Sequence, residues 1–212
     1  MAFDELRKPY LRGSLRAADL GNDPLRALRS WLAMAADAGE AEANAMALAT
    51  VGADGRPSVR FVLLKDVAEG GLTFFTNYGS RKARDLDASH HAALAFWWAS
   101  LERQARVEGS VERLPRDQSE AYFLTRPYGS QIGAWASHQS TVLDGRASLE
   151  ARAAELRARY PEGAVPCPPF WGGYLLRPSR FEFWQGRDDR LHDRFAFESA
   201  GDGGWTVVRL AP

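Results

Sequence analysis

The sequence predicts an α+β fold, an antiparallel β-barrel with helices at its periphery. Short apolar segments of strand length follow one another through brief turns, and such connections favour antiparallel pairing. Segments with helical periodicity are set aside from these strands. The chain has no internal repeat and no clear boundary, so we expect one domain over residues 1–212.

The N-terminal part predicts an arm followed by a helix. Residues 1–22 are polar and irregular, which is typical of a mobile arm that becomes ordered on binding. Asp23 and Pro24 are the residue types of an N-cap and a first helical position. Apolar residues then recur at helical spacing up to Gly39, a typical helix end.

The next segments predict a hairpin, a third strand and a short helix. Residues 45–51 and 58–65 are two apolar runs that flank a glycine-containing turn, which is the pattern of a β-hairpin. A second turn leads into another strand over residues 72–76. Ser80 can then cap a helix that continues to Asp87.

The second half of the chain predicts further strands and two helical segments. Proline at Arg126-Pro127 breaks the first helical segment, and Pro161 ends the second. The predicted strands are 93–99, 103–114, 171–176, 180–186, 194–199 and 205–210, and the predicted helical segments are 115–136 and 147–160.

Composition limits the partners and the compartment. Lys+Arg and Asp+Glu are both 27, so the chain has no general attraction to nucleic acid or to an anionic membrane. Cys167 is the only cysteine, which fits a reducing compartment. The N-terminus lacks a signal-peptide core, and the apolar run around 92–101 is too short for a bilayer, which needs about 20 residues. We therefore expect a cytoplasmic protein without nucleic-acid or membrane partners.

Several catalytic motifs are absent. The sequence contains neither of the two standard glycine-rich phosphate loops and no G-x-S-x-G. It also has no H-E-x-x-H and no cysteine pair, so we expect no metal site. Cys167 lies among prolines without an adjacent base, and we interpret it as a structural thiol.

Two segments place cations beside strand ends. Arg60 and Lys65 flank an apolar run. They point to opposite faces on a strict alternation, unless the strand ends before Lys65. Composition alone favours two solvated strand-end cations. In the second segment Ser80, Arg81 and Lys82 begin a helix directly after Phe75-Thr76-Asn77, and a helix N-terminus with two cations suits a bound phosphate. A solvated face is an equal alternative there.

A third pattern combines hydroxyl and guanidinium groups. Tyr122 and Arg126 are four residues apart, and Ser130 follows a Pro-Tyr-Gly turn. Gln139 and Ser140 come shortly afterwards. These groups suit a phosphate, although a plain helix N-cap is a strong alternative for Ser130.

The fourth pattern lies between Phe181 and Arg194. If the chain is extended after the turn, Arg190, His192 and Arg194 share one face, and Trp184 on the neighbouring strand can stack on a planar ring. A solvent-exposed polar face is the alternative.

Together the four patterns supply several phosphate ligands and aromatic rings but no nucleophile. This combination suggests a phosphorylated redox cofactor bound beside a phosphorylated substrate.

Several long motifs also match one known family in order. They are RFVLLK, FFTNYGSRKA, LERQ, YFLTRPYGSQIGAW with SHQS, PFWGGY, FEFWQGRDDRLHDRF and the terminal RLAP. The chain resembles the pyridoxine/pyridoxamine 5′-phosphate oxidases nearly from end to end. The resemblance implies an FMN-binding split β-barrel and a homodimer with FMN at its interface. It also implies oxidation of pyridoxine or pyridoxamine 5′-phosphate to pyridoxal 5′-phosphate, with O₂ reduced to H₂O₂ and ammonia released from the amine.

The resemblance assigns roles motif by motif. Arg190 and His192 would lie at the reacting end of the substrate, as the catalytic pair. The implied FMN-binding residues are Arg60, Phe61, Val62, Leu63, Leu64, Lys65, Phe75, Thr76, Arg81, Lys82, Gln104, Gln139, Ser140, Trp184 and Arg194. The implied substrate-binding residues are Lys65, Tyr122, Arg126, Ser130, Arg190, Leu191 and His192, together with Arg7, Lys8, Pro9 and Tyr10 of the arm.

Two positions depart from the family pattern, and two other functions stay open. Phe75 stands where a tyrosine is common, so we expect a backbone contact there, and Tyr128-Gly129 alters the loop before Ser130.

One alternative function is that of another flavin oxidoreductase on the same barrel, such as a nicotinamide-dependent reductase. The other is a non-catalytic flavin- or pyridoxal-phosphate-binding protein.

Overall fold

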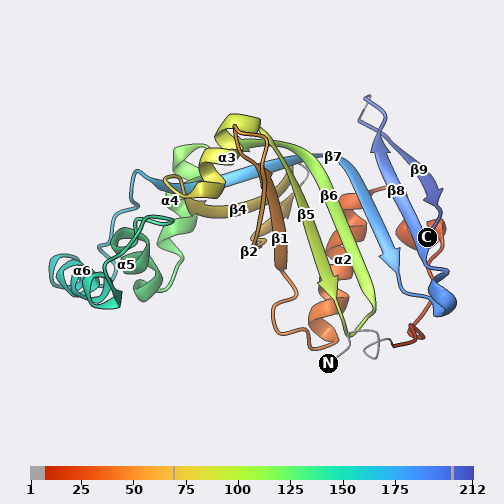
Figure 1. The fold of residues 1–212 in the computed structure, drawn as a ribbon, viewed down its shortest axis with the longest axis horizontal. Coiled ribbons are helices and arrows are strands. Elements are labelled where there is room, and N and C mark those ends of the chain that lie inside the picture. The colour runs from red at the N-terminus through yellow and green to blue at the C-terminus, as the bar shows by residue number, and fades with distance from the viewer. Residues whose placement is uncertain (1–7, 69, 202) are drawn as a thin grey trace.

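The computed structural model describes residues 8–68, 70–201 and 203–212, whose strands form one curved antiparallel sheet (Figure 1). The sheet order is β2-β1-β5-β6-β7-β4-β3, and β8 and β9 extend it from β7. This arrangement confirms the antiparallel α+β expectation. The strands are β1 (Ala45–Val51), β2 (Pro57–Leu63), β3 (Asp66–Ala68), β4 (Gly71–Asn77), β5 (His91–Trp98), β6 (Arg103–Arg113), β7 (Trp171–Gln185), β8 (Asp193–Ser199) and β9 (Trp205–Leu210).

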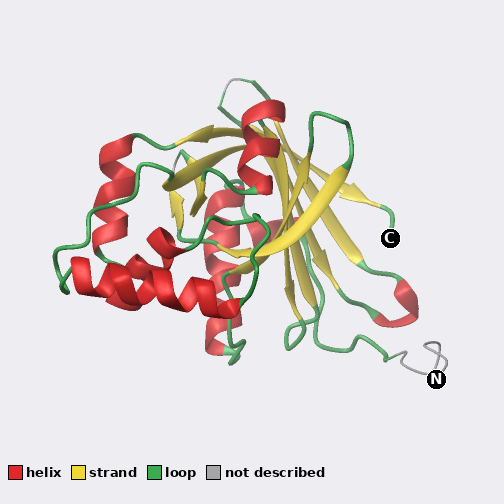
Figure 2. Cartoon of the chain, turned by 60° about the vertical axis from the view of Figure 1, so that its left-hand side comes forward, coloured by secondary structure: helices red, strands yellow, loops and turns green. Residues whose placement is uncertain are grey.

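Helices cover the inner face and one end of the sheet (Figure 2). They are α1 (Ala17–Leu20), α2 (Pro24–Asp37), α3 (Arg81–Ser89), α4 (Arg116–Leu124), α5 (Tyr128–Ala136), α6 (Arg146–Arg159) and a short 3₁₀ helix, η2 (Asp188–Arg190). None of the described helices is long and apolar enough to cross a membrane.

Local sequence explains how α2 begins and what it buries. The Asp23 side chain accepts hydrogen bonds from the backbone N–H groups of Leu25 and Arg26, and Pro24 occupies the first turn, as predicted. Trp31 is buried and packs edge-on against Phe183, with ring centroids 5.0 Å apart. The helix is therefore fixed against the inner face of the sheet.

Strand alternation separates a packed inner face from an apolar outer face. Alternate residues of β1 and β5, such as Met46, Leu48 and Phe96, are fully buried in the main core. The opposite face carries Phe61, which is 78% exposed, and Trp97, which is 50% exposed. The outer face of the sheet therefore leaves these two large apolar side chains open to solvent.

The long strand β7 differs from the prediction, which placed separate strands at 171–176 and 180–186. Residues Trp171–Gln185 form one strand that pairs with β6 on one side, and with β4 and then β8 on the other. The register shifts between Glu108 and Gly109, opposite Pro178. This bulge accommodates the proline, which cannot donate to the ladder, so the strand continues. The predicted turn before β4 also contains the short strand β3.

The helices α4, α5 and α6 lie beyond one end of the sheet (Figure 1). The chain breaks between α4 and α5 at Arg126-Pro127, as predicted. Buried Phe123 and Trp171 contribute to a second apolar cluster under these helices. Arg116 on α4 donates hydrogen bonds to the backbone oxygens of Cys167, Pro168 and Trp171, and so fastens α4 to the start of β7.

The described part of the predicted arm lies against β8. The backbone N–H of Leu15 donates to the Asp193 carboxylate at 3.0 Å, and Leu15 and Leu20 are buried. That the arm is mobile stays a prediction.

Candidate functional site

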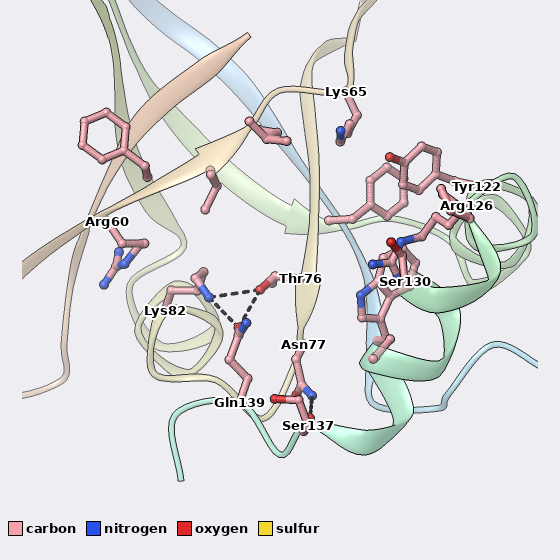
Figure 3. Close-up of a pocket in the computed structure, with 18 of the residues that line it drawn as sticks. Arg60, Lys65, Thr76, Asn77, Lys82, Tyr122, Arg126, Ser130, Ser137 and Gln139 are labelled. Carbon is pink, nitrogen blue, oxygen red and sulfur yellow. Dashed lines mark hydrogen bonds between the residues drawn. The ribbon is translucent and has the colours of Figure 1, made fainter. Parts of the chain in front are cut away.

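A pocket of about 820 Å³ lies between the sheet and the helices α3, α4 and α5 (Figure 3). In the view of Figure 3, Arg60 and Lys82 lie on one side of β4, and Tyr122, Arg126 and Ser130 lie on the other. The predicted residues that line it are Arg60, Phe61, Val62, Leu63, Lys65, Phe75, Thr76, Lys82, Tyr122, Arg126, Ser130 and Gln139. The fold thus brings together residues from three of the four sequence patterns.

Lys82 forms the first polar corner of the pocket. Ser80 caps α3 as predicted, because its hydroxyl accepts from the backbone N–H of Ala83. The Lys82 Nζ donates to Gln139 Oε1 at 2.6 Å and to Thr76 Oγ1 at 3.1 Å. Burial, together with the nearby charge of Arg60, lowers the pKa of Lys82 to about 8. A half-buried ammonium at a helix N-terminus is a favourable environment for an anion.

Arg60 points from β2 into the same corner. Its Nη1 donates to the Leu48 carbonyl oxygen at 3.1 Å and to Thr50 Oγ1 at 2.7 Å, and its Nη2 donates to the Ser58 hydroxyl. Burial lowers the pKa of Arg60. The solvated strand-end interpretation is therefore wrong for Arg60. Strand β2 ends at Leu63, so the alternation of side chains between the two sheet faces does not extend to the exposed residue Lys65. Both cations therefore line the same pocket.

Arg126 and an aromatic stack form the opposite wall. The Arg126 guanidinium lies over the Trp171 ring, 4.6 Å from its centroid, and its buried Nη1 has no hydrogen-bond partner among the residues that the structure describes. Burial lowers the pKa of Arg126. The rings of Phe75 and Tyr122 are stacked with centroids 3.9 Å apart. A buried guanidinium nitrogen without an acceptor is costly, so this wall is suited to an anionic ligand.

Ser130 lies in the first turn of α5 but does not cap it. The N-cap is Pro127, and the helix begins at Tyr128. The N-cap interpretation of Ser130 is therefore wrong, because Pro127 is the N-cap and the helix begins before Ser130. Its exposed hydroxyl lines the pocket near Arg126.

A second cluster lies at the far end of β7. Gln104, Trp184 and Arg194 are successive partners across β6, β7 and β8. The His192 ring lies 4.6 Å from that of Trp184, and Tyr10 of the arm packs edge-on against both rings. These residues do not line the pocket.

The predicted common face of Arg190, His192 and Arg194 is wrong. Asp189 and Arg190 have φ values of 52° and 61° inside η2, and β8 begins only at Asp193. The tight turn interrupts the two-residue alternation, because left-handed residues reverse the chain direction. A left-handed arginine is strained, and such strain is common at functional sites.

His192 is held through one ring nitrogen. Its Nδ1 accepts from the backbone N–H of Arg187 at 3.1 Å, so the neutral ring carries its proton on Nε2. Burial and the charges of Arg190 and Arg194 lower the pKa of His192, which favours this neutral form. The ring can therefore offer an Nε2–H donor.

The two groups of residues are far apart within one chain. Gly173, the partner of Phe75, and Trp184 are eleven residues apart on β7, or roughly 35 Å of extended strand. One chain alone therefore presents the predicted site as two halves.

The remaining predicted residues have varied positions. The Leu64 side chain is buried in the core and away from the pocket. The Ser140 hydroxyl accepts from the backbone N–H of Arg81 at 3.2 Å, which places both beside Lys82. Lys8, Pro9, Arg190 and Leu191 are exposed, and Arg7 lies outside the described residues.

Sequence reasoning missed several lining residues. Asn77, Thr125, Ser137 and Trp171 line the pocket. Trp97 lies beside Trp184, with ring centroids 5.9 Å apart. Trp97 could have been found from the alternation of side chains in the predicted strand 93–99. This alternation places Trp97 on the face opposite the buried Trp98.

Two family models match most of the chain. Residues 32–160 match the model described as pyridoxamine 5′-phosphate oxidase. Residues 171–212 match the pyridoxine 5′-phosphate oxidase C-terminal dimerisation region. The chain belongs to the pyridoxamine 5′-phosphate oxidase family. The suspected resemblance is thereby confirmed, and the chain is a member of a family of flavin oxidoreductases.

Curated members of the pyridoxamine 5′-phosphate oxidase family align over nearly the whole chain. A pyridoxine/pyridoxamine 5′-phosphate oxidase of Ralstonia pickettii is 54% identical over 208 residues, which cover 98% of each protein. One of Burkholderia vietnamiensis is 54% identical over 210 residues, with the same coverage.

Solved structures confirm the split-barrel fold of the family. PhzG from Burkholderia lata, in complex with tetrahydrophenazine-1-carboxylic acid, has a TM-score of 0.87 at 35% identity and covers 93% of this chain and 98% of its own. A pyridoxamine 5′-phosphate oxidase-related, FMN-binding protein of Nostoc punctiforme has a TM-score of 0.72 at 17% identity, covering 87% and 97%. The second likeness concerns the fold alone.

Proposed function

We propose that this family member is a cytoplasmic FMN-dependent oxidase that converts pyridoxine or pyridoxamine 5′-phosphate to pyridoxal 5′-phosphate, in vitamin B6 synthesis and salvage. O₂ accepts the electrons and becomes H₂O₂. With the amine substrate, water supplies the aldehyde oxygen and ammonia is released. The names of relatives that are 54% identical over 98% of the chain support this activity. The observation that carries it is the pair of cationic corners in one pocket, one at Lys82 and one at Arg126. Two corners suit two phosphate groups.

The Lys82 corner would hold the FMN phosphate. Arg60, Lys82 and the hydroxyl of Thr76 offer convergent charge-assisted donors, with the N-terminus of α3 behind them. The side chains of Val62 and Leu63 offer apolar surface along the same wall. When bound, FMN would supply the acceptor for a hydride from the substrate C4′ carbon.

The Arg126 corner would hold the substrate phosphate. The unpaired Nη1 of Arg126 needs an acceptor, and the Ser130 hydroxyl and the Lys65 ammonium line the same wall. Tyr122 stacks on Phe75 and presents its hydroxyl from α4. Binding energy from the phosphate would fix the position of the reacting carbon.

The second cluster would complete the site from another protomer. We infer a homodimer in which the pocket of one protomer faces Trp184, Arg190, His192 and Arg194 of its partner. The match of residues 171–212 to a dimerisation region supports this, as do the exposed Phe61 and Trp97 side chains. Within this arrangement, the Nε2–H of His192 would donate to the substrate, since its Nδ1 already accepts a hydrogen bond.

The activity can be tested directly. We expect the purified protein to be yellow, or to become yellow with FMN, and to form peroxide and pyridoxal 5′-phosphate from pyridoxamine 5′-phosphate in air. A protein that takes up no flavin would contradict the proposal. A yellow protein without turnover would favour a non-catalytic binding protein instead.

Substitution of Arg126 tests the substrate-phosphate corner. We expect Arg126→Met to raise KM for pyridoxamine 5′-phosphate by about 10²-fold, because a charged hydrogen bond to a buried group contributes about 1.5–3 kcal/mol. Binding of FMN should change little. The matched control is Arg146→Met, which removes an exposed arginine of α6 outside the pocket. An unchanged KM in Arg126→Met would place the substrate phosphate elsewhere.

A further inference from the structure

Asp85 is a buried carboxylate behind the Lys82 corner that the proposed chemistry does not use. It lies on α3, three residues after Lys82, and is 7% exposed. Its Oδ2 accepts from the Thr50 hydroxyl at 2.7 Å and lies 3.8 Å from Arg60 Nη2. Asp85 does not line the pocket, so its carboxylate approaches Arg60 from behind the pocket wall.

Neutral acceptors already hold Arg60 in place. The Leu48 carbonyl and the hydroxyls of Thr50 and Ser58 each accept a hydrogen bond from its guanidinium. Asp85 reaches Arg60 at 3.8 Å, a distance of charge attraction and not of a hydrogen bond. The distinct contribution of Asp85 is therefore its negative charge.

That charge has opposite effects on the empty and the filled pocket. Without an anion, Arg60 and Lys82 lie near each other in a half-buried setting, where burial first, and then the charge of Arg60, lower the pKa of Lys82. Asp85 then stabilises the pair. A phosphate bound at Arg60 would lie within about 10 Å of the carboxylate, where partial burial weakens screening, and the two anions would repel.

We propose that Asp85 is a counter-ion that partly neutralises the positive charge of Arg60 in the empty pocket and thereby weakens the binding of the FMN phosphate. It stabilises the FMN-free protein but lowers its affinity for FMN. The role rests on the proposed FMN site, and it makes Asp85 a determinant of affinity for the phosphate group alone.

The test compares FMN with riboflavin, which lacks the phosphate. We expect Asp85→Asn to lower the Kd of FMN by about threefold to tenfold, while the Kd of riboflavin stays unchanged. Flavin fluorescence quenching on the FMN-free protein measures both. The same substitution should lower the Tm of the FMN-free protein, because Arg60 loses its counter-ion, and FMN should restore most of the loss.

Asp87→Asn is the matched control. Asp87 lies on the same helix and pairs with Arg113 and the Tyr174 hydroxyl, away from the pocket. It should lower the Tm of the FMN-free protein without changing the ratio of the two Kd values. If Asp85→Asn does not fold, Asp85→Ser, which also removes the charge, is measured in its place.

The outcomes separate this inference from the proposed function. An FMN Kd that is unchanged or raised in Asp85→Asn, in a protein that prefers FMN to riboflavin, would overturn the counter-ion role and leave the FMN site standing. A wild-type protein that binds FMN no better than riboflavin would overturn both.

Discussion

Lys82 shows how a single residue sets the conditions under which the pocket binds. Its ammonium contacts Gln139 and Thr76 and loses solvent to α3 and the sheet, so the pKa falls to about 8. The unfolded chain holds this proton up to a pKa near 10.4. Between about pH 8 and 10 the unfolded state therefore binds more protons at this side chain, so the contribution of Lys82 to the stability of the FMN-free protein should increase as the pH rises.

Binding of FMN should show the opposite trend. The phosphate needs a charged Lys82, so we expect FMN affinity to be constant below about pH 8 and to fall by up to tenfold per pH unit above it. A bound phosphate raises the pKa of Lys82 in the complex, so the affinity stops falling once the pH exceeds that raised pKa. Fluorescence titrations between pH 6.5 and 9.5 measure this. The affinity of the wild-type protein for riboflavin should not fall above about pH 8, and neither should the affinity of Lys82→Met for FMN. A flat FMN profile in the wild type would show that another cation holds the phosphate.

The bulge between β6 and β7 shows how one element serves both halves of the site. Strand β7 carries Gly173 beside Phe75 at one end and Trp184 at the other. Between them, Gly109 approaches β7 so closely that a Cβ would lie 2.0 Å from the Arg177 carbonyl oxygen. Only glycine permits this approach, which keeps the strand continuous past Pro178.

We therefore expect Gly109→Ala to destabilise the protein by about 2–4 kcal/mol, because the clash involves backbone that cannot move aside. Urea unfolding of the FMN-free protein measures the loss. Gly129→Ala is the control. Its Cβ meets nothing within 4 Å in α5, so it should be neutral or slightly stabilising. Equal stability of the two variants would mean that the bulge is not required.

At the scale of the whole molecule, the separated halves predict a site shared between protomers. Arg126 lines the pocket, whereas His192 lies at the far end of β7. In a heterodimer of Arg126→Met with His192→Ala, one site would carry both defects and the other would be intact. At substrate concentrations near the wild-type KM, where each mutant homodimer should be nearly inactive, we expect about half of wild-type turnover from the heterodimer.

The heterodimer can be isolated by co-expressing the two variants with different affinity tags and purifying on both. Its turnover is then compared with that of each homodimer. A heterodimer as inactive as the two homodimers would contradict a shared site and would require both residues to act within one chain.

The sequence by itself determined the elements and the family. Capping by Asp23 and Ser80, the break at Arg126-Pro127 and most strands are local features, because they depend on residues a few positions apart. The long motifs named the family in the same way, since residue types and order do not depend on the fold.

Only the tertiary structure decided what these residues face. It placed Arg60 and Lys65 in one pocket, left Arg126 Nη1 buried without an acceptor, and set Asp85 behind Arg60. It also replaced the extended 190–194 segment with a left-handed turn. Burial, ion pairing and strand register arise from residues distant in the chain, and no local pattern reports them.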